Sequence, residues 1–255
     1  NCLDRHLKNR AEQAAIVWEP NDPNAKNRIL SYKELHQEVC RFSNVLRDQG
    51  IKKGDRICLY MPMIPELAIA QLASARVGAV HSIVFAGFSA TAIASRIEDS
   101  KCKMLITVNE MYRGAKTINL KSICDEALKA APSVEKVIVY EHTDAETNIE
   151  AGRDLLWKEL VNDVSDHAEA ESMDAEDLLF ILYTSGSTGK PKGMVHHCGG
   201  YMIGATYTFL NVFQYKEGDI YWCTADIGWI TGHSYIIYGP LAAGATTLMF
   251  EGVPT

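Results

Sequence analysis

Short apolar runs alternate with amphipathic segments along most of the chain, and this alternation limits the possible folds more than any other feature. Buried strands are predicted for the runs at residues 56–60, 80–85, 104–108 and 136–140. Helical spacing of apolar residues fills the gaps between them, at residues 64–76, 89–99 and 120–131. Strands joined by helices in this way run parallel, with right-handed crossovers and helices on both faces of the sheet. The sequence therefore predicts an α/β fold of layered sheets with mostly parallel strands and flanking helices.

A capping box predicts where the first long helix begins. Ser31 and Glu34 have the spacing at which each side chain covers a free backbone amide of the first helical turn. Apolar residues then recur at helical spacing as far as Leu46, and Gly50 offers the left-handed conformation that commonly ends a helix.

A polar, acid-rich stretch interrupts the alternation at residues 141–177, with one helix predicted over 155–164. We take this stretch as a possible subdomain junction. Beyond it the alternation resumes, with strands predicted at 178–183, 220–223 and 246–250 and helices near 200–213 and 233–241.

Composition narrows the classes of partner. The formal net charge is −7, which argues against binding along a nucleic-acid backbone. No apolar run is long enough to cross a bilayer, and the first residues do not have the pattern of a signal peptide. The seven cysteines are scattered without CxxC spacing, as is typical of reduced thiols in a cytosolic protein. We expect a cytoplasmic protein with small-molecule partners, no nucleic acid and no membrane, and its oligomeric state stays open.

The most informative motif is YTSGSTGKPKG, residues 183–193, which follows an apolar strand and precedes a helix-forming region. Glycines let a backbone turn several amides toward one point, hydroxyls add small donors, and lysines add positive charge. A flexible surface turn would also be rich in Ser, Thr and Gly, but the whole lysine-flanked string favours a cradle for a polyphosphate. The spacing differs from that of a P-loop. The predicted phosphate-binding residues are Thr184, Ser185, Gly186, Ser187, Thr188, Gly189, Lys190 and Lys192.

This motif resembles the phosphate-loop signature of the adenylate-forming superfamily, which includes acyl-CoA synthetases, luciferases and the adenylation domains of peptide synthetases. Within that superfamily, residues 2–6, 60–66, 86–97 and 218–255 resemble acetyl-CoA synthetases, so the resemblance covers the whole chain. It implies an ATP-dependent ligase that converts acetate and CoA to acetyl-CoA, AMP and pyrophosphate through an acetyl-adenylate, with ATP, CoA and Mg²⁺ as its small molecules.

The resemblance also implies that residues 1–255 are a truncated portion of the large N-terminal adenylation domain, without its C-terminal part and the small mobile domain. The first residue is not Met, and the chain stops just after a strand-like run, which fits a fragment. Because the catalytic lysine of such enzymes lies in the missing part, no catalytic residue is assigned here. We expect the fragment alone to be inactive.

Two further segments receive roles through the resemblance. Trp229 and Ile230 correspond to the apolar wall of the acid pocket, and Thr231 to a position near the tunnel for the CoA thiol. An isolated Trp would more often be a core residue. Residues 113–116 correspond to the segment that meets the phosphorylated ribose end of CoA, with Gly87 nearby. The predicted CoA-binding residues are thus Arg113, Gly114, Ala115, Lys116, Thr231 and Gly87.

Lys116 departs from the family pattern, which commonly has Arg there, so the charge is kept but a planar bidentate grip is lost. Without the resemblance, Arg113 and Lys116 would be read as solvated surface charges. His196 and His197 have no third ligand at a suitable spacing, and no metal site is predicted.

Alternative functions remain at this point. A ligase for propionate or another short-chain acid fits nearly as well, because the residue that decides between these acids is expected beyond Thr255. A domain that loads a carrier protein is disfavoured by the CoA-type segment. A non-catalytic nucleotide-binding module is the alternative from another class.

Overall fold

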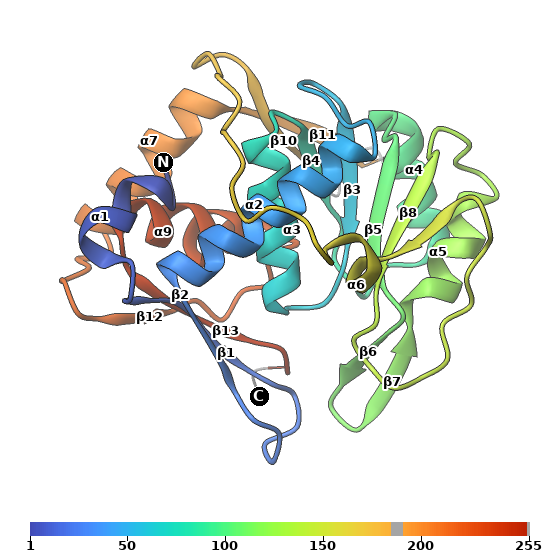
Figure 1. Cartoon of the computed structure of the whole chain (residues 1–255), viewed down its shortest axis with the longest axis horizontal. Coiled ribbons are helices and arrows are strands. Elements are labelled where there is room, and N and C mark those ends of the chain that lie inside the picture. Colours follow the sequence, from blue (N-terminus) through green and yellow to red (C-terminus); the bar gives the residue numbers. More distant parts are fainter. Residues whose placement is uncertain (185–190, 254–255) are drawn as a thin grey trace.

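The computed structural model describes residues 1–184 and 191–253, in which helices pack around a large and a small β-sheet (Figure 1). The large sheet has seven strands in the order β11 (Lys192–His197), β10 (Leu178–Thr184), β4 (Val80–Ile83), β3 (Arg56–Tyr60), β5 (Met104–Val108), β8 (Lys136–Tyr140) and β9 (Asp154–Leu156). All neighbouring strands in it are parallel except the β10–β11 pair. The predicted class of fold is confirmed.

The small sheet has four strands in the order β12 (Ile220–Trp222), β13 (Thr246–Phe250), β1 (Ala14–Glu19) and β2 (Arg28–Ser31). Here β12, β13 and β1 are parallel, and β2 returns antiparallel to β1. A separate two-stranded hairpin consists of β6 (Glu110–Arg113) and β7 (Lys116–Asn119). In Figure 1 this hairpin and the tip of the β1–β2 connection project at the lower edge of the molecule.

The helices of the first half are η1 (Asp4–His6), α1 (Leu7–Arg10), α2 (Tyr32–Asp48), α3 (Pro65–Arg76), α4 (Ala90–Ser100), α5 (Leu120–Leu128) and α6 (Trp157–Leu160). Those of the second half are α7 (Cys198–Asn211), α8 (Ile230–Gly232), the π-helix η2 (His233–Tyr238) and α9 (Gly239–Ala243). None of the helices in the described part of the chain combines the length and apolar character that a bilayer crossing requires.

Helix α2 begins where the capping box predicts. The Glu34 backbone N–H donates to Ser31 Oγ at 3.2 Å, and the Ser31 backbone N–H donates to Glu34 Oε2 at 2.8 Å. Helix α3, in contrast, has no polar face, because it lies buried on nearly all sides between the sheets. Its one acidic residue, Glu66, accepts a hydrogen bond from Arg28 Nη1 at 2.7 Å, which satisfies a buried charge.

The structure corrects the predicted elements at three places. Residues 192–197, for which no element was predicted, form the strand β11, whose backbone pairs with β10, and the helix predicted near 200–213 follows as α7. The helix predicted over 155–164 is only the single turn α6, since residues before it form β9 against β8. The strand predicted over 80–85 ends at Ile83, and the chain then turns. Whether residues 141–177 mark a subdomain junction stays a prediction.

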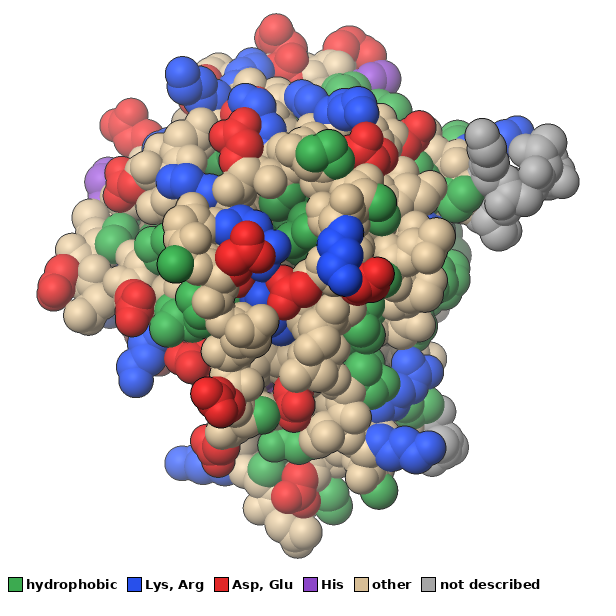
Figure 2. Space-filling model, turned by 90° about the vertical axis from the view of Figure 1, so that its right-hand side faces the viewer, with side chains coloured by type: hydrophobic (Ala, Val, Ile, Leu, Met, Phe, Trp, Pro, Cys, Tyr) green, Lys and Arg blue, Asp and Glu red, His purple; other side chains and the backbone are tan. Residues whose placement is uncertain are grey.

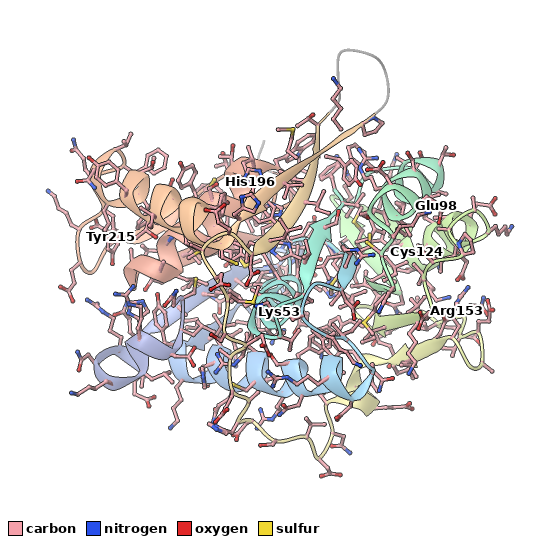
Figure 3. All side chains as sticks on the ribbon, turned by 90° about the horizontal axis from the view of Figure 1, so that it is seen from above. Lys53, Glu98, Cys124, Arg153, His196 and Tyr215 are labelled. Carbon is pink, nitrogen blue, oxygen red and sulfur yellow. The ribbon has the colours of Figure 1, made fainter. Side chains whose placement is uncertain are left out.

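A buried ion network holds β9 against α5. The Lys121 ammonium lies 2.7 Å from Asp125 and 2.8 Å from Asp154, and Arg153 bridges the same two carboxylates. Figure 3 shows Arg153 and Cys124 on the same side of the molecule, far from Tyr215. Because each charge has a hydrogen-bonded partner, this end of the large sheet tolerates buried ions.

Candidate functional site

A cavity of about 140 Å³ opens where the carboxyl ends of the two sheets meet. The large sheet contributes the turns after β3, β4 and β5, and the small sheet contributes the turns after β12 and β13. The lining residues are Pro62, Met63, Phe85, Ala86, Gly87, Met111, Tyr112, Arg113, Trp222, Cys223, Thr224, Ala225, Asp226, Phe250, Glu251, Gly252 and Val253.

Sheet topology explains why the cavity lies here. From β3 the chain crosses to β4 on one side, and it then crosses back to β5 on the other side. Where two connections leave neighbouring strands in opposite directions, a crevice opens between them at the carboxyl ends of those strands. Ligands of parallel α/β proteins bind in this crevice. The cavity is therefore at the position where this class of fold most commonly places a ligand.

Phe85 lies at the centre of an aromatic and cationic cluster beside the cavity. Its ring centroid is 5.9 Å from that of Trp229 and 5.7 Å from that of Phe88. The Arg113 guanidinium carbon stands 5.6 Å from the centroid of the Phe85 ring. The structure thus places the predicted CoA-binding residues Gly87 and Arg113 in the same cluster as the predicted acid-pocket residue Trp229.

Asp226 gives the cavity an acidic wall opposite Arg113. Its Oδ1 accepts a 2.7 Å hydrogen bond from the Gly228 backbone N–H. Burial raises the pKa of this carboxyl to about 6, while the Gly228 amide and the positive charge of Arg113 act in the opposite direction. At neutral pH the cavity therefore holds a carboxylate that lacks full hydration and can accept a hydrogen bond from a ligand.

The segment that follows Asp226 brings the predicted acid-pocket residues to the surface. Trp229, Ile230 and Thr231 are all exposed, and none of the three lines the cavity. Gly232 packs so tightly against the backbone of Asp226 that a Cβ would stand 2.1 Å from its carbonyl oxygen. Only glycine fits there, which fixes how residues 229–231 are presented.

His233 supports the same segment from below. Its backbone N–H donates to the Trp229 carbonyl oxygen at 3.0 Å, and its Nδ1 lies 3.2 Å from the same oxygen. Complete burial lowers the pKa of His233 to about 4, so the ring is neutral at pH 7. A neutral ring with its proton on Nδ1 donates to that carbonyl, so His233 stabilises the backbone that presents Trp229.

The other predicted CoA-binding residues lie on the β6–β7 hairpin. Arg113 and Lys116 face each other in the ladder, with Gly114 and Ala115 as the two-residue turn between them. Among the described residues, no carboxylate is paired with Arg113 or Lys116. Both cations are exposed and free to meet an anion, although only Arg113 reaches the cavity wall.

Of the predicted phosphate-binding residues, the structure describes Thr184 and Lys192. They are paired across the β10–β11 ladder and both are exposed. Ser185, Gly186, Ser187, Thr188, Gly189 and Lys190 lie outside the described residues. Since β10 is parallel to β4, Thr184 ends its strand on the same carboxyl side as Phe85 and Gly87.

A buried arginine lies between the end of β10 and the aromatic cluster beside the cavity. The Arg96 guanidinium carbon lies 4.7 Å from the centroid of the Phe88 ring and 5.5 Å from that of Tyr183. Phe88 contacts Trp229 edge-to-face at 6.2 Å, and Tyr183 directly precedes Thr184. Cation–π stacking therefore joins the strand end that leads into the phosphate motif to the aromatic cluster of the cavity.

The adjacent histidines of β11 point to opposite faces of the strand, as successive strand residues do. His196 stacks on Phe180 with ring centroids 4.4 Å apart, and Figure 3 places it over the core, whereas His197 is exposed near Glu176. In the described part of the chain, no group of three His, Cys, Asp or Glu side chains is arranged to hold a metal ion.

Sequence reasoning missed the cavity residues Glu251 and Tyr112, and it missed Asn21, which does not line the cavity but hydrogen-bonds to Gly114 of the β6–β7 hairpin. No local motif marks them, because they meet only through the packing of the small sheet against the hairpin. Asp226 lies three residues before the predicted pocket residue Trp229, but its burial could not be read from the sequence. On the face shown in Figure 2, acidic and basic side chains are interspersed rather than gathered by sign.

Comparison with known proteins agrees with this geometry. A family model described as "AMP-binding enzyme" matches residues 3–255. The chain is 59% identical over 254 residues to an acetyl-coenzyme A synthetase of Desulfatibacillum aliphaticivorans, and it covers 39% of that protein. It is 56% identical to an acetyl-coenzyme A synthetase of Nostoc linckia, of which it covers 75%.

A solved structure supports the fold independently. The acetoacetyl-CoA synthetase of Streptomyces lividans superposes with a TM-score of 0.90 at 25% identity, over 99% of this chain and 38% of that protein. The chain thus spans about two fifths of the length of most of these relatives, whose names describe acetyl-coenzyme A and acetoacetyl-CoA synthetases.

Proposed function

Because the chain belongs to the family of AMP-binding enzymes, we propose that the protein containing it is an acetate–CoA ligase that forms AMP. The observation that carries this proposal is the cluster at the carboxyl ends of the strands, where Arg113, Gly87 and Phe85 line one cavity and Trp229 packs against the Phe85 ring beside it. A single cavity with an unpaired cation and an apolar wall suits a small acid at one side and a phosphorylated thiol substrate at the other.

The first half-reaction needs positioning more than acid–base chemistry. A carboxylic acid is already ionised at neutral pH, so its oxygen can attack the α-phosphorus of ATP and displace pyrophosphate, leaving the acyl-adenylate. The backbone amides and side chains of residues 184–192 would hold the β- and γ-phosphates. Lys192, the first residue of β11, would add positive charge. Mg²⁺, bound through the phosphates of ATP, would neutralise part of their charge.

In the second half-reaction the CoA thiol loses its proton and attacks the acyl carbonyl carbon, which breaks the bond to AMP. The role of this chain is to place the CoA nucleotide. Arg113 and Lys116 offer two unpaired cations for its ribose phosphate. At Gly87 a Cβ would stand 2.5 Å from Phe85 Cε1 and 2.9 Å from Arg113 Nη1, so the glycine lets these two side chains pack closely at the cavity wall. Trp229 and Ile230 would limit the length of the acyl group, since each excluded methylene is worth about 1–3 kcal/mol.

The proposal is tested by measuring acid-dependent exchange of labelled pyrophosphate into ATP, and then thioester formation, with the complete protein. Acetate should support both reactions, while propionate and acetoacetate serve as competing acids. Preference for either competitor would change the substrate but keep the ligase. Absence of exchange with all three acids would refute the ligase itself and favour a nucleotide-binding module.

Residues 1–255 alone provide a second measurement. We propose that this piece has no ligase activity, because the expected catalytic lysine and the other residues that would enclose ATP and CoA lie outside it. Appreciable acetyl-CoA formation by the purified piece would contradict this part of the proposal.

A further inference from the structure

The β6–β7 hairpin carries the two proposed CoA-binding cations but is weakly supported by its own structure. It is a two-stranded sheet that is hydrogen-bonded to no third strand among the described residues. Such a hairpin is marginally stable in water unless other elements fix it. The position of Arg113 and Lys116 therefore depends on what holds the turn between them.

One side chain from a distant loop holds that turn. Asn21, in the connection between β1 and β2, donates from Nδ2 to the Gly114 carbonyl oxygen at 2.8 Å. The Gly114 backbone N–H in turn donates to Asn21 Oδ1 at 3.0 Å. An amide side chain has one acceptor and one donor side, so Asn21 satisfies both backbone groups of Gly114, the first of the two residues between the cations.

Asn21 is itself fixed by a buried carboxylate. Its backbone N–H donates to Glu251 Oε2 at 3.0 Å, while Glu251 Oε1 lies 2.6 Å from His142 Nε2. The Glu251 side chain is 1% exposed, so this anchor belongs to the interior, at the end of β13. The His142 ring packs edge-to-face against Tyr112, next to Arg113, with centroids 5.7 Å apart. Glu251 thus supports the hairpin both through Asn21 and through His142.

We propose that Asn21 is a positioning residue for CoA: by clamping Gly114 it holds Arg113 and Lys116 in the arrangement that meets the ribose phosphate. This inference rests on the proposed function of the hairpin. Prior ordering of a binding element lowers the entropy lost on association, so loss of the clamp should weaken CoA binding and leave the adenylation step intact.

The test is Asn21→Ala in the complete protein. The KM for CoA should rise about three- to tenfold, which is the size expected for the net loss of one or two hydrogen bonds. The kcat and the rate of acid-dependent pyrophosphate exchange, which needs no CoA, should be unchanged. The matched control is Asn24→Ala in the same loop. Among the residues that the structure describes, the Asn24 side chain hydrogen-bonds only to Asp22, so this change should leave every parameter as it is.

A double-mutant cycle separates positioning from general loosening. In a background of R113A and K116A, and likewise with dephospho-CoA as substrate, Asn21→Ala should have little further effect on the KM. An equal effect in both backgrounds, or none in either, would overturn the proposal. If R113A with K116A leaves the KM for CoA unchanged, the CoA site itself is wrong, and that result is distinct from a failure of Asn21 alone.

Hydrogen exchange gives a readout that does not need activity. The Gly114 amide should be protected in the unaltered protein and should exchange faster in Asn21→Ala, with the amides of β3 and β5 unaffected. Equal protection in both proteins would mean that Asn21 does not hold the turn.

Discussion

Gly87 shows how a single missing side chain shapes the cavity. A Cβ at this position would stand 2.5 Å from Phe85 Cε1 and 2.9 Å from Arg113 Nη1, so one of the two groups would have to move. We predict that Gly87→Ala raises the KM for CoA severalfold with little loss of stability, because Gly87 is exposed. Steady-state kinetics of the complete protein tests this, with Gly200→Ala on α7 as the control, where an added Cβ meets nothing within 4 Å. Equal KM values in the two variants would contradict it.

Asp226 makes the protein less stable as the pH rises, which is the opposite of the usual effect of a carboxyl group. Its folded pKa of about 6 lies above the ordinary value near 4, so between these pH values the folded protein binds the proton more tightly than the unfolded chain does. The free energy of unfolding therefore falls as the pH rises through this window. Asp226→Asn keeps an oxygen for the Gly228 amide and removes the charge.

We expect Asp226→Asn to stabilise the protein by about 1–2 kcal/mol at pH 7.5, a value discounted for partial solvent screening, and by almost nothing at pH 4. Urea unfolding at the two pH values measures the difference. Equal stabilisation at both would show that packing, and not the buried charge, is responsible.

At the scale of single elements, α2 and α4 each begin at a serine N-cap, and the two caps differ in strength. Ser31 forms a reciprocal capping box at the start of α2, whereas Ser89 accepts one long bond of 3.4 Å from the Ala92 backbone N–H at the start of α4. We predict that Ser31→Ala costs about 1 kcal/mol of unfolding free energy and Ser89→Ala clearly less. Thermal or urea unfolding of the two variants decides, and a larger loss from Ser89→Ala would contradict the ranking.

How well each strand could be predicted follows from its place in a sheet. The strands β3, β5 and β8 have the predicted bounds, because parallel strands covered on both faces read as continuous apolar runs. Edge and hairpin strands carry no such signal. The strand β11 has mostly exposed or half-buried residues, and the β6–β7 hairpin is largely polar, so both are defined by backbone pairing that the sequence does not display.

The same distinction applies to the candidate site. Arg113 and Trp229 could be found because each belongs to a recognisable segment. Asn21, His142 and Glu251 could not, since they are 109 or more residues from at least one partner and meet only when the small sheet packs beside the hairpin. Residues that position a site through long-range packing leave no spacing rule in the sequence.

At the scale of the whole molecule, a buried joint of histidine and aromatic rings connects the two sheets. His81 on β4 lies 2.6 Å, through Nε2, from the hydroxyl of Tyr238 in η2, the helix that leads through α9 to β13. The Phe180 ring of β10 stands 4.7 Å from that of His233 and 5.3 Å from that of His81. Burial lowers the pKa of both histidines, that of His233 to about 4, so neither ring is charged at neutral pH.

Acid should therefore destabilise the whole molecule through this cluster of buried rings. The unfolded chain binds a proton at each histidine near pH 6.5, whereas the folded protein resists it, so the free energy of unfolding falls as the pH drops below 6.5. His233 alone should contribute about 2.5 kcal/mol of loss between pH 7 and pH 4.5. His233→Gln removes this titration, so its unfolding free energy should fall less steeply over that range, even if it starts lower because the bond to Trp229 is altered.

The control is His167→Asn, which removes an exposed histidine outside this cluster of buried rings. Urea unfolding at half-unit steps of pH gives the three slopes. Parallel slopes for the unaltered protein and His233→Gln would contradict the idea that acid acts on this joint. A flatter slope in His233→Gln alone would identify the contact between the sheets as the acid-sensitive part of the fold, and it would predict that the presentation of Trp229 is lost over the same pH range.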